Sequence, residues 1–127
     1  MPLIELKTII KSDIKSCFDL SRNIDFHQIS LKHSSEKAVA GKTSGLIGLG
    51  EQVTWEAKHF WVTQQLTSKI TAFDSPYYFV DEMISGAFKS IKHEHIFETE
   101  SDKTLMTDKF YFETPFGFFG KLFKINI

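Results

Sequence analysis

The chain has 127 residues, a length typical of a single domain with one core, and its 15 basic and 16 acidic side chains give a net charge of −1. A charge so close to zero provides no field for nucleic acid, and no apolar run approaches the roughly 18 residues of a membrane-spanning helix. The single cysteine, Cys17, excludes an internal disulfide and fits a reducing, cytoplasmic compartment. The 13 phenylalanines favour a core or cavity lined by flat apolar side chains.

Residues 2–10 alternate between apolar and polar side chains in the manner of a half-buried strand. Ile4 and Leu6 fall on one face, and Glu5 and Lys7 fall on the other. The pattern predicts a first strand with one face turned toward the core.

Two short helices are expected after this strand. Ser12 or Asp13 can cap the first, whose apolar side chains recur at helical spacing from Ile14 to Phe18. An apolar stripe that continues from Ile24 predicts a second turn or helix.

The middle of the chain is predicted to be a meander of antiparallel strands. Residues 30–48 are rich in Ser, Gly and Lys and predict a connecting loop with room for a short strand. The breakers that follow, such as Asp74-Ser75-Pro76, are too short for the crossover that parallel strands require. Five strands are expected, at residues 49–60, 64–73, 77–84, 87–100 and 104–114.

Strand alternation predicts which side chains point inward, except in residues 77–84, whose two faces are too alike to distinguish. The inward residues expected in this way are Trp55, Ala57, His59, Leu66, Ser68, Ile70, Ala72, His93, His95, Phe97, Met106, Asp108, Phe110 and Phe112. Three histidines and an aspartate among aromatic side chains need partners or water. The pattern therefore favours an internal space that holds some water.

The inward set His59, His93, His95 and Asp108 contains the candidate catalytic residues, because imidazoles beside a carboxylate can move protons or bind a transition metal. We favour a polar lining that orients a ligand's head group, and a structural hydrogen-bond network is the second interpretation. Neither a metal nor another cofactor is expected, since no further cysteine or tight histidine spacing accompanies the set.

Three other patterns predict no site. The Gly-Lys-Thr segment at residues 41–43 lacks the earlier glycine of a phosphate-binding loop. Asp81 and Glu82 are neighbours on a strand, so they point to opposite faces and cannot enter one site together. Cys17 has no basic neighbour to activate its thiol and is expected to be buried.

Several short blocks together resemble a bacterial branch of the SRPBCC superfamily over essentially the whole chain. They are residues 21–27 (SRNIDFH), 50–60 (GEQVTWEAKHF), 66–70 (LTSKI), 79–83 (FVDEM), 86–89 (GAFK), 93–95 (HEH) and 105–108 (LMTD). The resemblance implies one α+β domain over residues 1–127 with the helix-grip, or START-like, fold. In that fold a curved antiparallel sheet surrounds a C-terminal helix, two short helices follow the first strand, and an apolar cavity lies between them.

The chain departs from the family at two places. Trp61 stands where a small residue is more common, and the segment after Pro115 is shorter than the family's C-terminal helix, which therefore looks truncated. The apolar residues of this segment are Phe118, Phe119, Leu122 and Phe123. We expect them to pack across the open groove of a second copy in a homodimer, unless the chain is a fragment.

The residues and the resemblance together predict a non-enzymatic binding or carrier protein for a hydrophobic small molecule, such as a lipid, quinone, polyketide or aromatic metabolite. The expected ligand-binding residues are Trp55, His59, Ile70, His93, His95, Phe97, Asp108, Phe110 and Phe112. Two alternatives remain open. One is an enzyme of the polyketide cyclase or dehydratase kind in which His59, His93 or His95 moves a proton, and the other is a protein-interaction module whose groove binds a partner's helix.

Overall fold

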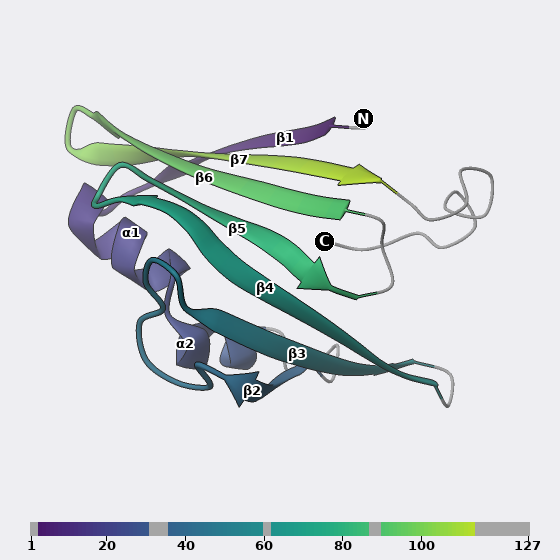
Figure 1. Ribbon diagram of the computed structural model, residues 1–127. Coiled ribbons are helices and arrows are strands. Elements are labelled where there is room, and N and C mark those ends of the chain that lie inside the picture. The colour runs from purple at the N-terminus through teal and green to yellow at the C-terminus, as the bar shows by residue number, and fades with distance from the viewer. Residues whose placement is uncertain (1–2, 31–35, 60–61, 87–89, 114–127) are drawn as a thin grey trace.

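One antiparallel sheet of seven strands dominates the computed structural model, which describes residues 3–30, 36–58, 62–86 and 90–113 and the backbone of His59 (Figure 1). In spatial order the strands are β1 (Leu3–Ile10), β7 (Lys103–Glu113), β6 (Ser90–Glu100), β5 (Tyr78–Ser85), β4 (Val62–Asp74), β3 (Gln52–His59) and β2 (Lys37–Gly41). All neighbouring strands are antiparallel. The first and last of these strands in the chain therefore lie side by side.

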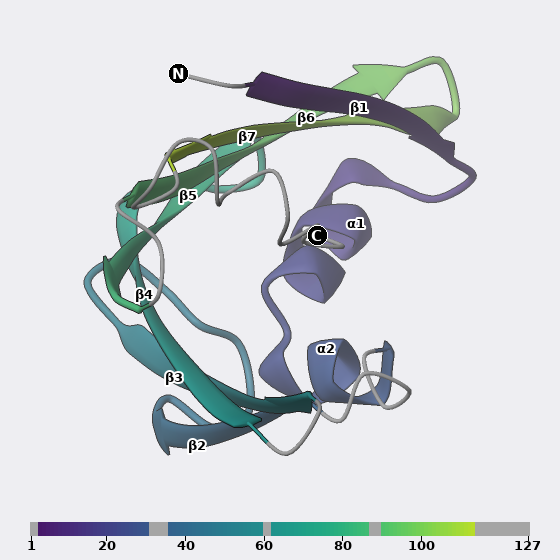
Figure 2. The same ribbon diagram turned by 90° about the vertical axis from the view of Figure 1, so that its right-hand side faces the viewer.

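Two short helices follow β1 and lie inside the curve of the sheet (Figure 2). Helix α1 (Ile14–Ser21) begins after Asp13, whose carboxylate accepts a hydrogen bond of 3.0 Å from the backbone N–H of Ser16. Two residues separate the end of α1 from the start of helix α2 (Ile24–Ser30). Among the described residues, no helix is long and apolar enough to cross a membrane.

The predicted order of elements is confirmed, with strand ends that differ by a few residues. Strand β2 is the short strand for which the loop at residues 30–48 left room. The turn at Asp74-Ser75-Pro76 is also confirmed, since it joins β4 to β5. The expectations for Trp61 and for the helix and homodimer contact at residues 118–123 lie outside the described residues.

Strand β1 is more exposed than its alternation predicts. Ile4 and Leu6 pair with Phe110 and Asp108 of β7, so they share the inward face of that strand. They are nevertheless 40% and 52% exposed, and only Ile10, at the end of the strand, packs against the core. The predicted first strand is therefore confirmed, but within the described residues it is an exposed edge strand, so the prediction that one of its faces is buried is wrong.

A β-bulge in β4 changes which side chains face the core. The register between β4 and β5 shifts between Ile70 and Ala72, and beyond the shift Phe73 packs against the core. The predicted inward position of Ala72 is therefore wrong, because strict alternation does not allow for an extra residue. Ser68 and Ile70, which precede this shift, are both buried.

Phe18 of α1 lies at the centre of the core. It is fully buried, and its ring meets the rings of Phe73, Phe79 and Phe97 edge to face, with centroids 5.3, 5.4 and 5.4 Å away. Each such pair contributes about 0.5–1.5 kcal/mol beyond the burial of its area. One side chain thus connects α1 to β4, β5 and β6. Its neighbour Cys17 is also buried, as predicted.

We expect Phe18→Ala to lower the free energy of unfolding by about 3–5 kcal/mol, or to unfold the protein, because it leaves a cavity among three aromatic rings. Leu20→Ala is the matched control, since Leu20 lies on the same helix and is 47% exposed. Its expected cost is about 1 kcal/mol or less. Urea denaturation followed by circular dichroism measures both values, and equal losses would contradict the central role of Phe18.

Candidate functional site

Four polar side chains meet on the concave face of the sheet, and we call them the His–Asp cluster: Asp81 of β5, His93 and His95 of β6, and Asp108 of β7. The register places Asp81 opposite His93, and His95 opposite Asp108. Alternate residues of a strand point to the same face. The four side chains therefore share the face on which Phe79 and Phe97, two positions away along β5 and β6, contact α1.

Each histidine lies between the same two carboxylates. His93 has its Nε2 atom 2.9 Å from Asp108 Oδ1 and its Nδ1 atom 3.8 Å from Asp81 Oδ2. His95 is reversed, with Nε2 2.8 Å from Asp81 Oδ2 and Nδ1 3.4 Å from Asp108 Oδ1. The two imidazoles therefore run in opposite directions, and their ring centroids are 3.5 Å apart.

Aromatic rings cover the outer faces of the two imidazoles. Phe79 stacks on His95 with ring centroids 4.0 Å apart. The ring centroid of Phe110 lies 3.8 Å from that of His93. The order across the sheet is therefore Phe79, His95, His93, Phe110. The side chains of the cluster remain between 11% and 27% exposed, with Asp81 the most exposed. Asp81 is thus the cluster side chain most open to solvent, and Phe79 and Phe110 cover the outer imidazole faces.

Burial and hydrogen bonding shift the pKa values of the cluster in different directions. Burial opposes the charge on His95, but its hydrogen bonds with Asp108 and Asp81 outweigh that effect and raise its pKa. Burial lowers the pKa of His93, and the hydrogen bond with Asp108 does not compensate for it. Burial also opposes ionised carboxyl groups, yet contacts with the histidines hold the pKa values of Asp81 and Asp108 below the usual range. The two carboxyl groups are therefore ionised at neutral pH, and protonation is favoured at His95 over His93.

His27 of α2 is a further imidazole near this site, and strand alternation could not predict it. Its ring centroid lies 4.7 Å from that of Trp55 on β3. Burial lowers its pKa, Asp81 opposes this effect, and the two cluster histidines add to it. Neighbouring protein atoms thus remove part of the ring's hydration, although the residue as a whole is still exposed to solvent. Its helical spacing from the buried Ile24 is the sequence signal that could have placed it on the inner side of α2.

A pocket of about 270 Å³ lies between the helices and the sheet. Cys17, Leu20 and Phe26 supply apolar walls from the helices, Met106 adds one from β7, and His27 provides an imidazole. Among the side chains that the structure describes, none of the expected ligand-binding residues lines this pocket. The helices therefore contribute pocket walls that strand alternation does not identify.

The expected ligand-binding residues occupy three environments: the His–Asp cluster, the packed core and the position beside His27. His93, His95 and Asp108 come together in the cluster, where Phe110 packs on His93. Phe112 follows on the same face of β7 and is partly buried.

The remaining expected residues lie away from the cluster or beside it. Phe97 and Ile70 are 1% and 3% exposed and belong to the packed core, although Ile70 is opposite Asp81 in the register. Trp55 lies beside His27, and the side chain of His59 is outside the described residues. Asp81 belongs to the cluster. Its position shows that the face of β5 that carries Phe79 and Asp81 points inward.

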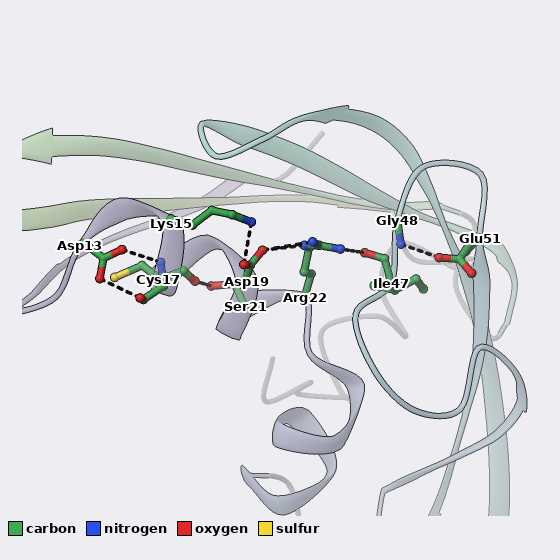
Figure 3. A network of polar contacts seen from close by, with 10 residues as sticks. Asp13, Lys15, Cys17, Asp19, Ser21, Arg22, Ile47, Gly48 and Glu51 are labelled. Atoms are coloured by element: carbon green, nitrogen blue, oxygen red, sulfur yellow. Dashed lines mark hydrogen bonds and ion pairs between the residues drawn. The ribbon is translucent and has the colours of Figure 1, made fainter.

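A second polar network fixes the start of α2 to the loop between β2 and β3 (Figure 3). The guanidinium of Arg22 donates hydrogen bonds of 3.1 Å to the Asp19 carboxylate and to the carbonyl of Ile47, whose N–H donates to the Arg22 carbonyl at 3.0 Å. The same guanidinium lies over the rings of Phe18 and Phe73, 5.6 and 5.3 Å from their centroids. The segment at residues 21–27 thus has a structural role that orients α2 and, with it, His27.

Solved structures match most of the described fold. Major latex-like protein 151 from Panax ginseng is 19% identical with a TM-score of 0.66, and the match covers 91% of this chain and 80% of that one. Ara h 8.0201 is 15% identical with a TM-score of 0.69, over 91% and 79% of the two chains. TTHA0849 from Thermus thermophilus is 15% identical with a TM-score of 0.69, over 95% and 80%.

The chain shares the helix-grip fold with these proteins. No protein-family model and no curated protein matches the sequence. The curved antiparallel sheet and the two short helices after β1 confirm, at the level of the fold, what the sequence resemblance implied.

We expect the cluster histidines of this helix-grip protein to titrate on opposite sides of the usual value of about 6.5, His95 above it and His93 below it. The raised pKa of His95 stabilises the fold fully below about pH 6.5, and this contribution is lost as the pH rises through the folded pKa. NMR of the imidazoles in the presence of a chelator measures both, with His93→Gln and His95→Gln to assign the signals. Asp81→Asn should lower the pKa of His95, and two histidines that titrate together near 6.5 would contradict the assignment.

Proposed function

We propose that the protein binds a hydrophobic small molecule in the concavity of its sheet, and that the His–Asp cluster holds the ligand's polar group. The observation that carries the proposal is a partly exposed polar cluster set among aromatic side chains on the concave face. Apolar walls with a few convergent polar groups are the usual composition of small-molecule sites. The function implied by the SRPBCC resemblance is of the same class.

Apolar surface on the same side of the sheet supports this proposal. Ile4 and Leu6 of β1 continue the face of Phe110 and are exposed, so they can add to the contact area. The pocket of about 270 Å³ between the helices and the sheet approaches the roughly 300–1,000 Å³ of ligand sites. A ligand that reaches from this pocket toward the cluster would bury both surfaces.

The chemistry of Asp81 indicates which polar group the ligand carries. Asp81 is its most exposed member, and a carboxylate accepts hydrogen bonds but donates none. The two ionised carboxylates of the cluster disfavour an anionic group. We therefore expect a ligand that carries a hydroxyl or an amine beside its apolar part.

The geometry favours binding over proton transfer. Both ring nitrogens of His93 and of His95 face a carboxylate, and both ring faces are covered. A general base must bring a nitrogen within hydrogen-bond distance of the substrate's proton. In this arrangement neither histidine directs a free ring nitrogen into the concavity. The alternative of a cyclase-like enzyme is therefore the weaker interpretation.

Native mass spectrometry of the freshly purified protein tests whether an apolar molecule is bound. We expect an added mass that disappears when the protein is denatured. A homogeneous ligand-free protein that also fails to bind Nile red would contradict the proposal.

Competition experiments test the polar group. With Nile red as the reporter and a chelator present, decylamine and decanol should displace the dye at lower concentrations than decanoate does. Asp81→Asn should reduce the advantage of decylamine by about 10-fold, the effect of losing one charge-assisted contact of about 1.4 kcal/mol. Glu98→Gln removes a carboxylate from the opposite face of β6 and is the control. An undiminished advantage of decylamine in Asp81→Asn would show that Asp81 does not contact the ligand.

A further inference from the structure

We propose that Asp81, His93 and His95 form a binding site for a divalent transition-metal ion such as Zn²⁺. The potential ligand atoms of the three side chains all lie within 4.8 Å of one another. Two imidazole nitrogens and one carboxylate oxygen are a donor set suited to Zn²⁺ and Fe²⁺, and three protein ligands leave a position open. This proposal does not depend on the ligand proposed above.

The distances around Asp81 fit such an ion. Asp81 Oδ2 lies 2.8 Å from Nε2 of His95 and 3.8 Å from Nδ1 of His93. Tetrahedral zinc with bonds of about 2.0–2.1 Å separates its ligand atoms by roughly 3.3 Å. The two observed separations lie on either side of that value, and the two imidazole nitrogens lie within 4.8 Å of each other, so side-chain rotation is needed to bring all three atoms to bonding distance.

Asp108 supplies the hydrogen bonds that metal-bound imidazoles require. It lies 2.9 Å from Nε2 of His93 and 3.4 Å from Nδ1 of His95, which are the nitrogens that face away from Asp81. A metal-bound histidine commonly donates its other N–H to a carboxylate, and this contact selects the tautomer that can bind the ion. Asp108 is placed to do so for both rings, so it acts as a positioning residue and not as a ligand.

Charge and packing also favour the ion. An imidazole binds a metal only when it is neutral, so the ion would displace any proton that His95 holds, and the resulting charge of −2 on two carboxylates and two neutral imidazoles is cancelled by a divalent ion. The rings of Phe79 and Phe110 restrict rotation of the imidazoles, which keeps their nitrogens directed at the two carboxylates. The sequence led us to expect no metal because no further cysteine or tight histidine spacing accompanies the inward set; the pairing of β5 with β6 adds Asp81 to the two histidines.

Titration of chelator-treated protein with ZnCl₂, followed by calorimetry, tests the site, and the visible absorption of Co²⁺ reports its geometry. We expect one ion per chain. Asp81→Asn, His93→Gln and His95→Gln should each weaken binding by about 100-fold or more, since each removes a ligand. Asp108→Asn keeps all three ligands and should weaken binding by about 10-fold. Glu98→Gln, on the opposite face of β6, should leave affinity unchanged.

Failure of the wild-type protein to bind Zn²⁺ stoichiometrically would overturn the proposal, as would full affinity in both histidine variants. Circular dichroism shows whether each variant is folded. If the variants do not fold, NMR of the wild-type protein decides: Zn²⁺ should shift the imidazole nitrogen signals of His93 and His95. Shifts confined to other histidines would overturn the proposal. Because the dye competition is run with a chelator, its outcome is separate from this one.

Discussion

The ring of Phe18 holds α1 against β4, β5 and β6, and the position of that helix determines which part of the concave face stays accessible. Two of the rings that it contacts, Phe79 and Phe97, lie two positions along their strands from Asp81 and His95. The packed core therefore ends where the polar cluster begins. The same Phe79 stacks on the His95 imidazole, so one phenylalanine contributes to both the core and the site.

The regular part of the sheet could be predicted well from the sequence. Strands β6 and β7 are long and pair without a register shift, so alternation alone placed His93, His95 and Asp108 on one face. Their contacts with one another depend on register, which no single strand specifies. Asp81 shows this limit most clearly, because both faces of its strand carry similar side chains and only pairing with β6 determines which face points inward.

Features that depend on distant parts of the chain could not be predicted. The extra residue near Ala72 reverses the alternation of β4, and nothing in the local pattern marks it. The orientation of His27 depends on contacts between Arg22 and Ile47, which are 25 residues apart. Alternation in β1 identifies an apolar face but says nothing about whether another element covers it. In each case a long-range contact, and not a local preference, decides the structure.

The pairing of β1 with β7 leaves β1 unpaired for most of protein synthesis, because the ribosome makes β1 first and β7 last of the seven strands. Ile10 pairs with Thr104, so β1 leaves the ribosome long before β7, its neighbour in the described part of the sheet, exists. At roughly 5–20 residues per second, the interval is on the order of 5–20 s. During that interval the apolar side chains of β1, among them Leu3, Ile4, Leu6 and Ile9, have no strand beside them, and an unpaired apolar strand is prone to associate with other chains. The nascent chain is thus most vulnerable to aggregation at its oldest segment.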